Sequence, residues 1–244
     1  MERLDKILAS QGASSRKDVK EIIKSGRVAV NGKTVRDSSV KISDTDCVSL
    51  DGKILTLKKH IYLMLNKPEG IVSASDSKTE KTVVDLVPDE FFRSGLLPAG
   101  RLDKDTVGFV LITDDGDFAH RILSPKNHIV KTYEARLAKT LTEEQRQLIQ
   151  KGIVLSDGTT CLESRIKILE NGDASLVAIQ ICEGKYHQIK RMFAAAGNKV
   201  VSLKRTKMGD LELDASLLPG ECREITSEEL NKIEFGKSFS DFEQ

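Results

Sequence analysis

The stretch GRLDKDTVGFVLITDDG, residues 100–116, joins an acidic loop to a run of apolar residues. Residues 108–113 of this stretch are rich in β-forming side chains and are bounded by turn residues, which predicts a buried strand. Asp103 lies on the loop that leads into the strand. The tripeptide Arg-Leu-Asp also occurs at residues 3–5, so these three residues alone do not define a functional site.

Length and composition predict a soluble, cytoplasmic protein of two domains. The 244 residues can bury a substantial core. The apolar runs are much shorter than a membrane span, and the charged N-terminus has no signal-peptide core, so we expect no membrane association. The four cysteines are scattered and form no C-x-x-C pair, which predicts reduced thiols, mostly in the core, rather than a zinc site or disulfides.

The net charge of +1 hides two basic zones. Residues 1–60 carry 13 Lys or Arg against 8 Asp or Glu, and residues 185–207 carry seven Lys or Arg with no acidic residue. Residues 221–244 are acidic, with 3 basic against 7 acidic side chains. Two basic zones favour a polyanionic partner over an ordinary solvated surface.

Residues 1–58 predict a small domain of their own. Apolar residues at helical spacing indicate a first helix that begins near Leu4 and is ended by Gly12. A second helix is expected between a cap at Ser14 or Ser15 and a stop at Gly26. Asn-Gly at residues 31–32 and Asp-Gly at residues 51–52 then indicate two hairpins.

This first domain resembles the S4 RNA-binding domain. The resemblance rests on the Arg-Leu-Asp start, on Ser-Arg before the second helix, and on the pattern Gly-x-Val-x-Val-Asn-Gly at residues 26–32. It implies that Arg3 and Asp5 open a structural helix. Four basic residues on or beside the second helix, spaced to form an edge that faces phosphate, are candidate RNA contacts: Arg16, Lys17, Lys20 and Lys24.

Residues 61–236 predict a larger domain that follows a linker at residues 57–60. Strands are expected at 61–65, 108–113 and 130–137, a hairpin at 162–182, and further strands up to about residue 224. Helices are expected at 117–123, 142–151 and 185–196, and residues 237–244 look like a frayed tail. Hairpins dominate, which predicts an α+β fold with a mainly antiparallel or mixed sheet flanked by helices.

Several chemistries lack their sequence signatures. There is no phosphate-binding glycine loop, no H-E-x-x-H or close histidine spacing for a metal, and no G-x-S-x-G nucleophile elbow. We therefore expect neither a metal nor a cofactor, and Asp103 remains as the candidate reactive group.

Five motifs in order along nearly the whole chain resemble the rRNA pseudouridine synthases of the small-subunit type. They are Lys-Pro-Glu-Gly at 67–70, Gly-Arg-Leu-Asp at 100–103 with the turns that follow it, Ser-Pro at 124–125, Lys-Thr-Tyr at 131–133, and Glu-Gly-Lys-Tyr-His-Gln-Ile-Lys-Arg-Met at 183–192. The resemblance implies that one uridine of small-subunit (16S) rRNA is isomerised to pseudouridine. The implied partner is this rRNA or a pre-ribosomal particle, and the implied state is a monomer.

The resemblance also assigns roles to single residues. Asp103 is the essential carboxylate, which attacks C1′ of the sugar or C6 of the uracil, or acts through a glycal path. Lys190 is its buried cationic partner, with a phosphate-contacting surface cation as the alternative. Tyr133 stacks on the flipped uracil and its hydroxyl helps to remove the C5 proton, although an aromatic residue in a strand also suits ordinary sheet packing.

The remaining assignments concern RNA contact. Ile189 closes the other side of the base, and Arg101 fills the gap left by the extruded nucleotide unless it is a structural arginine paired with an aspartate. His187 contacts substrate or phosphate, and Arg191 contacts phosphate. On a helix that starts near residue 185, His187, Lys190 and Arg191 share one basic side.

Three alternative functions remain open. Residues 185–192 resemble the small-subunit branch more than the large-subunit branches, whose helix tends to begin with Asn-Arg-Gln, but a large-subunit (23S) rRNA substrate is the first alternative. The second is a non-catalytic S4-type RNA-binding factor in ribosome assembly. The third is a glycoside or nucleoside hydrolase, for which a second motif-borne carboxylate is lacking.

Overall fold

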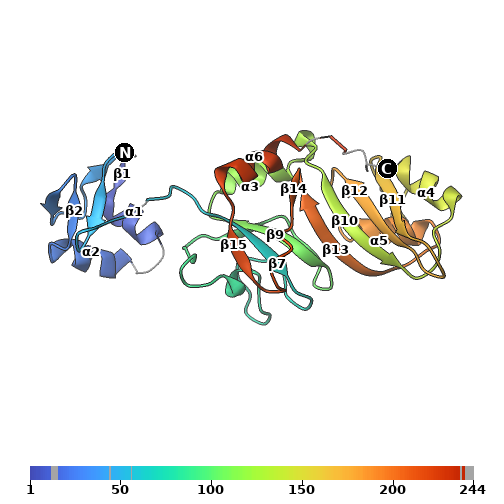
Figure 1. Ribbon diagram of the computed structural model, residues 1–244, viewed down its shortest axis with the longest axis horizontal. Coiled ribbons are helices and arrows are strands. Elements are labelled where there is room, and N and C mark those ends of the chain that lie inside the picture. Colours follow the sequence, from blue (N-terminus) through green and yellow to red (C-terminus); the bar gives the residue numbers. More distant parts are fainter. Residues whose placement is uncertain (12–15, 44, 56, 237, 240–244) are drawn as a thin grey trace. The chain divides into compact units, whose positions relative to one another are not determined.

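A computed structural model describes residues 1–11, 16–43, 45–55, 57–236 and 238–239. The chain packs into two compact units, Met1–Ile61 with Val87–Leu96, and Tyr62–Leu86 with Leu97–Gln244 (Figure 1). The sequence predicted domains at residues 1–58 and 61–236, and it did not predict that residues 87–96 would pack with the first unit. One contact that accounts for it is the hydrogen bond from Arg93 Nη1 to the carbonyl oxygen of Lys58, at 3.0 Å.

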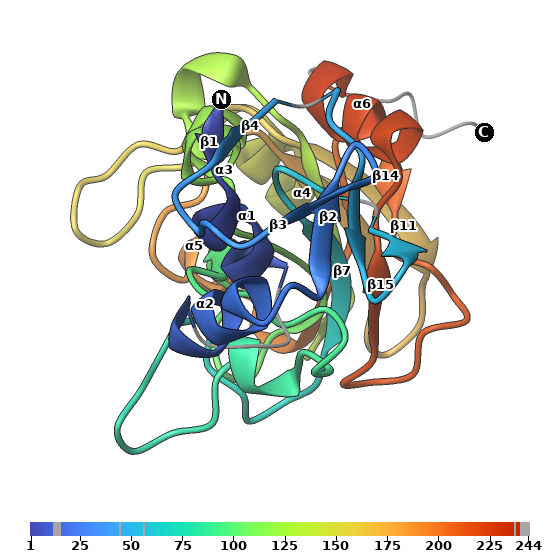
Figure 2. The ribbon, with the colours of Figure 1, turned by 90° about the vertical axis from the view of Figure 1, so that its left-hand side faces the viewer.

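The described residues of the first unit form two helices and two small sheets. Figure 2 shows them in blue. Helix α1 (Leu4–Ser10) and helix α2 (Arg16–Lys24) contact each other. The four-stranded sheet has the order β3 (Lys33–Val35), β2 (Val28–Val30), β5 (Val48–Leu50), β6 (Lys53–Ile54), and β1 (Glu2–Arg3) pairs with β4 (Lys41–Ile42). The predicted stop at Gly12 and the caps at Ser14 and Ser15 lie outside the described residues, as does most of the predicted tail.

Both predicted hairpin turns of the first unit are present. Asn31 and Gly32 have φ values of 51° and 76°, and Asp51 and Gly52 have 49° and 79°. Two consecutive positive φ angles match the right-handed twist of the flanking strands, which is why Asn-Gly and Asp-Gly suit these turns. The hydrophobic core of this unit contains Leu4, Val19, Ile23, Val28, Ile42 and Val48.

In the described part of the second unit, the strands form a nine-stranded sheet whose main path runs β11, β12, β10, β13, β9, β7, β15. The bounds of these strands are β11 (Arg165–Glu170), β12 (Leu176–Ile181), β10 (Lys131–Leu137), β13 (Val200–Met208), β9 (Val107–Thr113), β7 (Tyr62–Lys67) and β15 (Cys222–Glu224). Strand β14 (Leu211–Glu212) pairs with β13, and β8 (Leu97–Ala99) pairs with β9. Among the strand pairs of this sheet in the described residues, β9 and β13 run parallel and the others are antiparallel, so the expected α+β fold with a mixed, mainly antiparallel sheet is confirmed.

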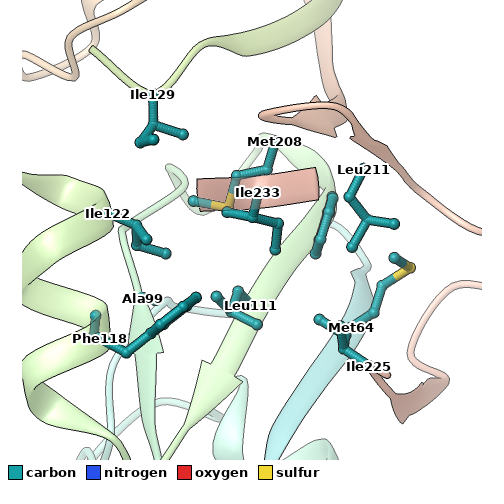
Figure 3. Packing of buried hydrophobic residues seen from close by; sticks show 12 residues of the cluster. Met64, Ala99, Leu111, Phe118, Ile122, Ile129, Met208, Leu211, Ile225 and Ile233 are labelled. Atoms are coloured by element: carbon teal, nitrogen blue, oxygen red, sulfur yellow. The ribbon is translucent and has the colours of Figure 1, made fainter. Parts of the chain in front are cut away.

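Helices cover both halves of this sheet (Figure 1). Helix α3 (Gly116–Leu123) contacts β8 and α6 (Ser227–Phe235) contacts β14, while α4 (Glu143–Gln150) contacts β11 and α5 (Gln188–Ala195) contacts β13. Single 3₁₀ turns occur at Val84–Leu86 and Pro125–Asn127. Figure 3 shows the core beneath α3 and α6, where Phe118 and Ile122 pack with Leu111, Met208 and Ile233.

The helices differ from the sequence-based expectations in two respects. Helix α6 was not predicted, although Thr226 and Glu229 form a capping box at its start. Helix α5 begins at Gln188 rather than near Lys185, because His187 has left-handed backbone angles of φ 47° and ψ 35°. His187 therefore precedes the helix instead of lying on its basic side.

The four cysteines, all in the described part of the chain, form no disulfide with one another. Cys161 is buried, Cys47 is exposed, and Cys182 and Cys222 are half-buried, so the expectation that most of them lie in the core is wrong. Among the residues that the structure describes, no helix has the length and apolar character needed to cross a lipid bilayer.

Candidate active site

Asp103 lies on the loop of residues 100–106, between β8 and β9, called here the Asp103 loop. Gly100 and Gly108 flank it with φ values of +96° and +98°, which L side chains rarely adopt. A Cβ on Gly108 would also collide with the backbone oxygen of Arg205, so only glycine allows β9 and β13 to approach in parallel here. The loop is closed by a hydrogen bond from the Thr106 N–H to the Asp103 carbonyl oxygen, at 3.0 Å.

Lys190 of α5 reaches across to the Asp103 loop. Its Nζ lies 3.0 Å from Asp103 Oδ2 and 2.5 Å from Asp105 Oδ1. The Asp103 and Lys190 side chains are 24% and 23% exposed, whereas Asp105 is 63% exposed. Burial opposes the charge of Lys190, but the hydrogen bonds to Asp105 and Asp103 outweigh it and raise the pKa of the ammonium. The structure thus brings the predicted carboxylate and the predicted cation into direct contact.

A small cavity of about 70 Å³ opens beside this pair and gathers five of the predicted site residues. Its wall includes Arg101, Asp103, Tyr133, His187 and Ile189. The side chains of Tyr133 and Ile189 are buried, with 8% and 3% exposure, while Arg101 is exposed. The cavity therefore combines an acidic group with buried aromatic and aliphatic side chains.

His187 contributes a second contact to the carboxylate. Its Nε2 lies 3.4 Å from Asp103 Oδ1, opposite the oxygen that Lys190 contacts. His187 has a positive φ of 47°, which is uncommon for a residue other than glycine. The left-handed turn at His187 directs the chain from the cavity wall into α5.

Lys67 is a site residue to which the sequence motif gave no role. Its side chain has 0% exposure, and its Nζ donates to the carbonyl oxygens of Pro68 and Lys104 at 3.1 Å and of Thr106 at 2.8 Å. Burial lowers the pKa of Lys67 to about 8. The ammonium bonds the Asp103 loop on both sides of Asp105 and thereby fixes its conformation.

Two further buried cations lie next to Tyr133. Arg205 is opposite Tyr133 in the β10–β13 pairing, is 3% exposed and donates from Nε to the Phe109 carbonyl oxygen at 2.7 Å. Lys131 is 6% exposed, and burial followed by repulsion from Arg205 lowers its pKa to about 8. The motif Lys-Thr-Tyr contained Lys131, but nothing in its spacing indicated burial.

The other predicted RNA contacts lie outside the cavity. Arg191 Nη2 lies 2.5 Å from Asp157 Oδ2, so the structure does not bring Arg191 to Asp103. In the first unit, Arg16 lies 3.6 Å from Asp5, and the side chains of Lys17, Lys20 and Lys24 are exposed on α2.

Asp5 itself is a structural residue, as its position at the start of α1 suggested. It has 0% exposure, and two hydrogen bonds from Arg3, each 3.0 Å long, hold its carboxylate. The two Arg-Leu-Asp tripeptides therefore have different surroundings: one aspartate is enclosed in a small core and the other lines a cavity.

Among the described residues, no group of three His, Cys, Asp or Glu side chains is arranged to hold a metal ion. The polar side chains that line the cavity include the Asp103 carboxylate, the His187 imidazole and the Tyr133 phenol, which are groups able to accept or donate protons.

Comparison with known proteins identifies the class to which this fold and site belong. Residues 61–195 match the RNA pseudouridylate synthase family, and residues 2–48 match the S4 domain. The chain belongs to the RNA pseudouridylate synthase family. It is therefore an isomerase that carries an S4 domain at its N-terminus, as the motifs indicated.

Individual relatives extend over almost the whole chain. An RNA pseudouridine synthase of Bacillus subtilis is 45% identical over 95% of this chain and 98% of its own length. The ribosomal small subunit pseudouridine synthase A of Vibrio vulnificus is 42% identical, and that of Escherichia coli K12 is 41% identical, each over 95% of this chain and 99% of its own. A crystal structure of a pseudouridylate synthase, 40% identical, covers 96% of this chain and 100% of its own with a TM-score of 0.66.

Proposed function

We propose that the protein converts one uridine of small-subunit rRNA into pseudouridine, with Asp103 as the essential carboxylate. The observation that carries the chemistry is the hydrogen bond from Lys190 to Asp103, beside a cavity that Asp103, Tyr133 and Ile189 line. Relatives about 40% identical that are named ribosomal small subunit pseudouridine synthase A support the choice of RNA.

The reaction is an isomerisation in which nothing is gained or lost overall. The bond from N1 of uracil to C1′ of the ribose breaks, the base turns, and C5 forms the new bond to C1′. The proton on C5 leaves and N1 takes up a proton, so no cofactor is consumed. Asp103 attacks C1′ or C6, or removes the proton at C2′; the ammonium of Lys190 holds the carboxylate in position for each of these routes.

The target uridine must leave its stack to reach Asp103. Tyr133 and Ile189, both almost fully buried in the cavity wall, provide the two surfaces between which the uracil is held. Arg101 is exposed at the same cavity and occupies the space that the base vacates in the RNA. His187 contacts the substrate next to Asp103.

Sequence-independent affinity comes from cations that face solvent. Lys17, Lys20 and Lys24 on α2, with Arg16 beside them, bind the phosphate backbone through the S4 domain, and Arg191 makes a further phosphate contact. The predicted partner is the rRNA or a pre-ribosomal particle in the cytoplasm, and the protein is expected to act as a monomer.

The test uses full-length transcripts of both rRNAs that carry tritium at C5 of uridine. The proposal predicts tritium release from the small-subunit transcript, and carbodiimide-dependent reverse-transcription stops that map to one uridine. Release from the large-subunit transcript alone would overturn the substrate. Liberated uracil would indicate a hydrolase, and binding of RNA with neither product would indicate a non-catalytic assembly factor.

A further inference from the structure

The residue just before His187 has an exposed aromatic ring. Tyr186 is 75% exposed, more than almost all other large apolar or aromatic side chains that the structure describes. Its ring stacks on the imidazole of His187, with centroids 3.9 Å apart and an interplanar angle of 16°. One face of the Tyr186 ring is therefore covered by His187, and the exposure of the residue leaves the other face open.

The backbone around Tyr186 is held in place. Arg191 Nη1 donates to the Tyr186 carbonyl oxygen at 3.3 Å, and the Lys185 ammonium donates to Glu183 Oε2 at 2.5 Å and to the Thr160 carbonyl oxygen at 2.8 Å. On the other side, the left-handed turn at His187 fixes the direction of the chain. The backbone that carries the exposed Tyr186 ring is therefore held in place by these contacts.

Tyr186 also has a defined relation to the cavity. Gly184, Lys185 and His187 line the cavity, and His187 contacts Asp103. The order from the carboxylate outward is Asp103, His187, then the Tyr186 ring. A flat group that stacks on the open face of Tyr186 would lie outside the cavity, in line with the imidazole.

We propose that Tyr186, backed by His187, is a stacking platform for the nucleobase next to the target uridine. This inference rests on the proposed function, because the neighbouring base is present only if an RNA strand delivers its uridine to Asp103. Every base has an aromatic face, so the platform accepts any base but requires that it be unstacked from its own neighbours. The platform positions the strand while the target base is in the cavity.

Stacking makes a quantitative prediction for kcat/KM. Tyr186→Ala is expected to lower kcat/KM by roughly fivefold to a hundredfold on the rRNA that the wild-type enzyme converts. Tyr186→Phe keeps the ring and is expected to remain within about twofold of wild type. Because Tyr186 is exposed, neither change should lower the melting temperature appreciably. Phe235→Ala is the matched control, since Phe235 is 73% exposed on α6, and it should leave kcat/KM unchanged.

A double-mutant cycle with the RNA distinguishes stacking from a structural role. The nucleotide on either side of the target uridine is replaced, one at a time, by an abasic residue. On one of these two RNAs, Tyr186→Ala should not lower kcat/KM any further, because the base that stacks on Tyr186 is already absent.

A fluorescence measurement tests the contact directly. The chain has no tryptophan, so Tyr186→Trp supplies a single indole whose emission a stacked base should quench, and the abasic RNA should abolish the quenching. Three results would each overturn the platform. The first is a wild-type kcat/KM for Tyr186→Ala, and the second is an equal loss of kcat/KM in Tyr186→Phe and Tyr186→Ala. The third is a loss of kcat/KM in Tyr186→Ala that is as large on both abasic RNAs as on the intact RNA. Failure of the wild-type enzyme to convert any rRNA would instead overturn the proposed function.

Discussion

Replacement of Lys131 by Met is expected to stabilise the protein at neutral pH. Lys131 lies two residues before Tyr133 on β10 and is 6% exposed. The nearby charge is the guanidinium of Arg205, itself 3% exposed. Burial and this repulsion lower the pKa of Lys131 from 10.5 to about 8, so folding at neutral pH requires an ammonium to be buried beside another cation.

The sign and size of the effect follow from proton linkage. Between pH 8 and pH 10.5 the unfolded chain holds the Lys131 proton and the folded chain releases it, so the folded state gains stability as the pH rises through this window. A shift of about 2.5 pKa units corresponds to about 3 kcal/mol. Methionine has a similar length and no charge, so Lys131→Met should raise the free energy of unfolding by roughly 2–3 kcal/mol at pH 7, and this gain should vanish near pH 10.5.

The assay is chemical unfolding followed by circular dichroism at several pH values from 7 to 10. Lys139→Met is the control, because Lys139 is an exposed lysine just beyond the same strand and its replacement should change stability by less than about 0.5 kcal/mol. A Lys131→Met variant that is less stable than wild type at pH 7, or a gain that does not change with pH, would refute the reasoning.

Four further substitutions test the roles assigned to single residues. Lys190→Met should lower kcat far more than RNA affinity because it removes the partner of Asp103, whereas Arg191→Met should mainly raise KM and reduce the salt slope of binding by about one; equal effects on both parameters in both variants would contradict this division. Lys67→Met should lower kcat by about tenfold or more, since three carbonyl contacts of the Asp103 loop and its flank are lost; an unchanged kcat would argue against positioning. Asp5→Asn should lower the stability of the first unit by about 1–3 kcal/mol, seen in thermal unfolding, and leave kcat unchanged.

Local features of the sequence were sufficient for most of the fold. The Asn-Gly and Asp-Gly turns were predictable because few other residue pairs adopt two positive φ angles in succession. Helix α6 was also predictable in principle from Thr226 and Glu229, but its acidic, weakly apolar sequence obscured the capping signal. The start of α5 was not predictable, because a left-handed histidine depends on contacts made by the folded chain.

The site required more than local pattern. Asp103 and Lys190 are 87 positions apart, and only the resemblance to a known family joined them before the structure placed their side chains 3.0 Å apart. Lys67, Lys131 and Arg205 were missed because basic side chains are rarely buried, and no short-range signal marks those that are. Their burial results from strands that meet only in the complete sheet.

The central claim is that Asp103 performs the chemistry, and Asp105 supplies the sharpest control. Both carboxylates contact Lys190, and replacing either one removes the same charge from the same loop. Asp103 lines the cavity, whereas Asp105 is 63% exposed and does not line it. The decisive measurement is therefore tritium release from C5-labelled small-subunit rRNA by Asp103→Asn and Asp105→Asn, with RNA affinity measured in parallel.

We predict that Asp103→Asn releases no tritium while binding RNA within about tenfold of wild type, because loss of one negative charge does not weaken attraction to phosphate. Asp105→Asn should retain most of the wild-type turnover. Measurable turnover by Asp103→Asn, or an equal loss in both variants, would contradict the assignment of Asp103 as the reacting carboxylate.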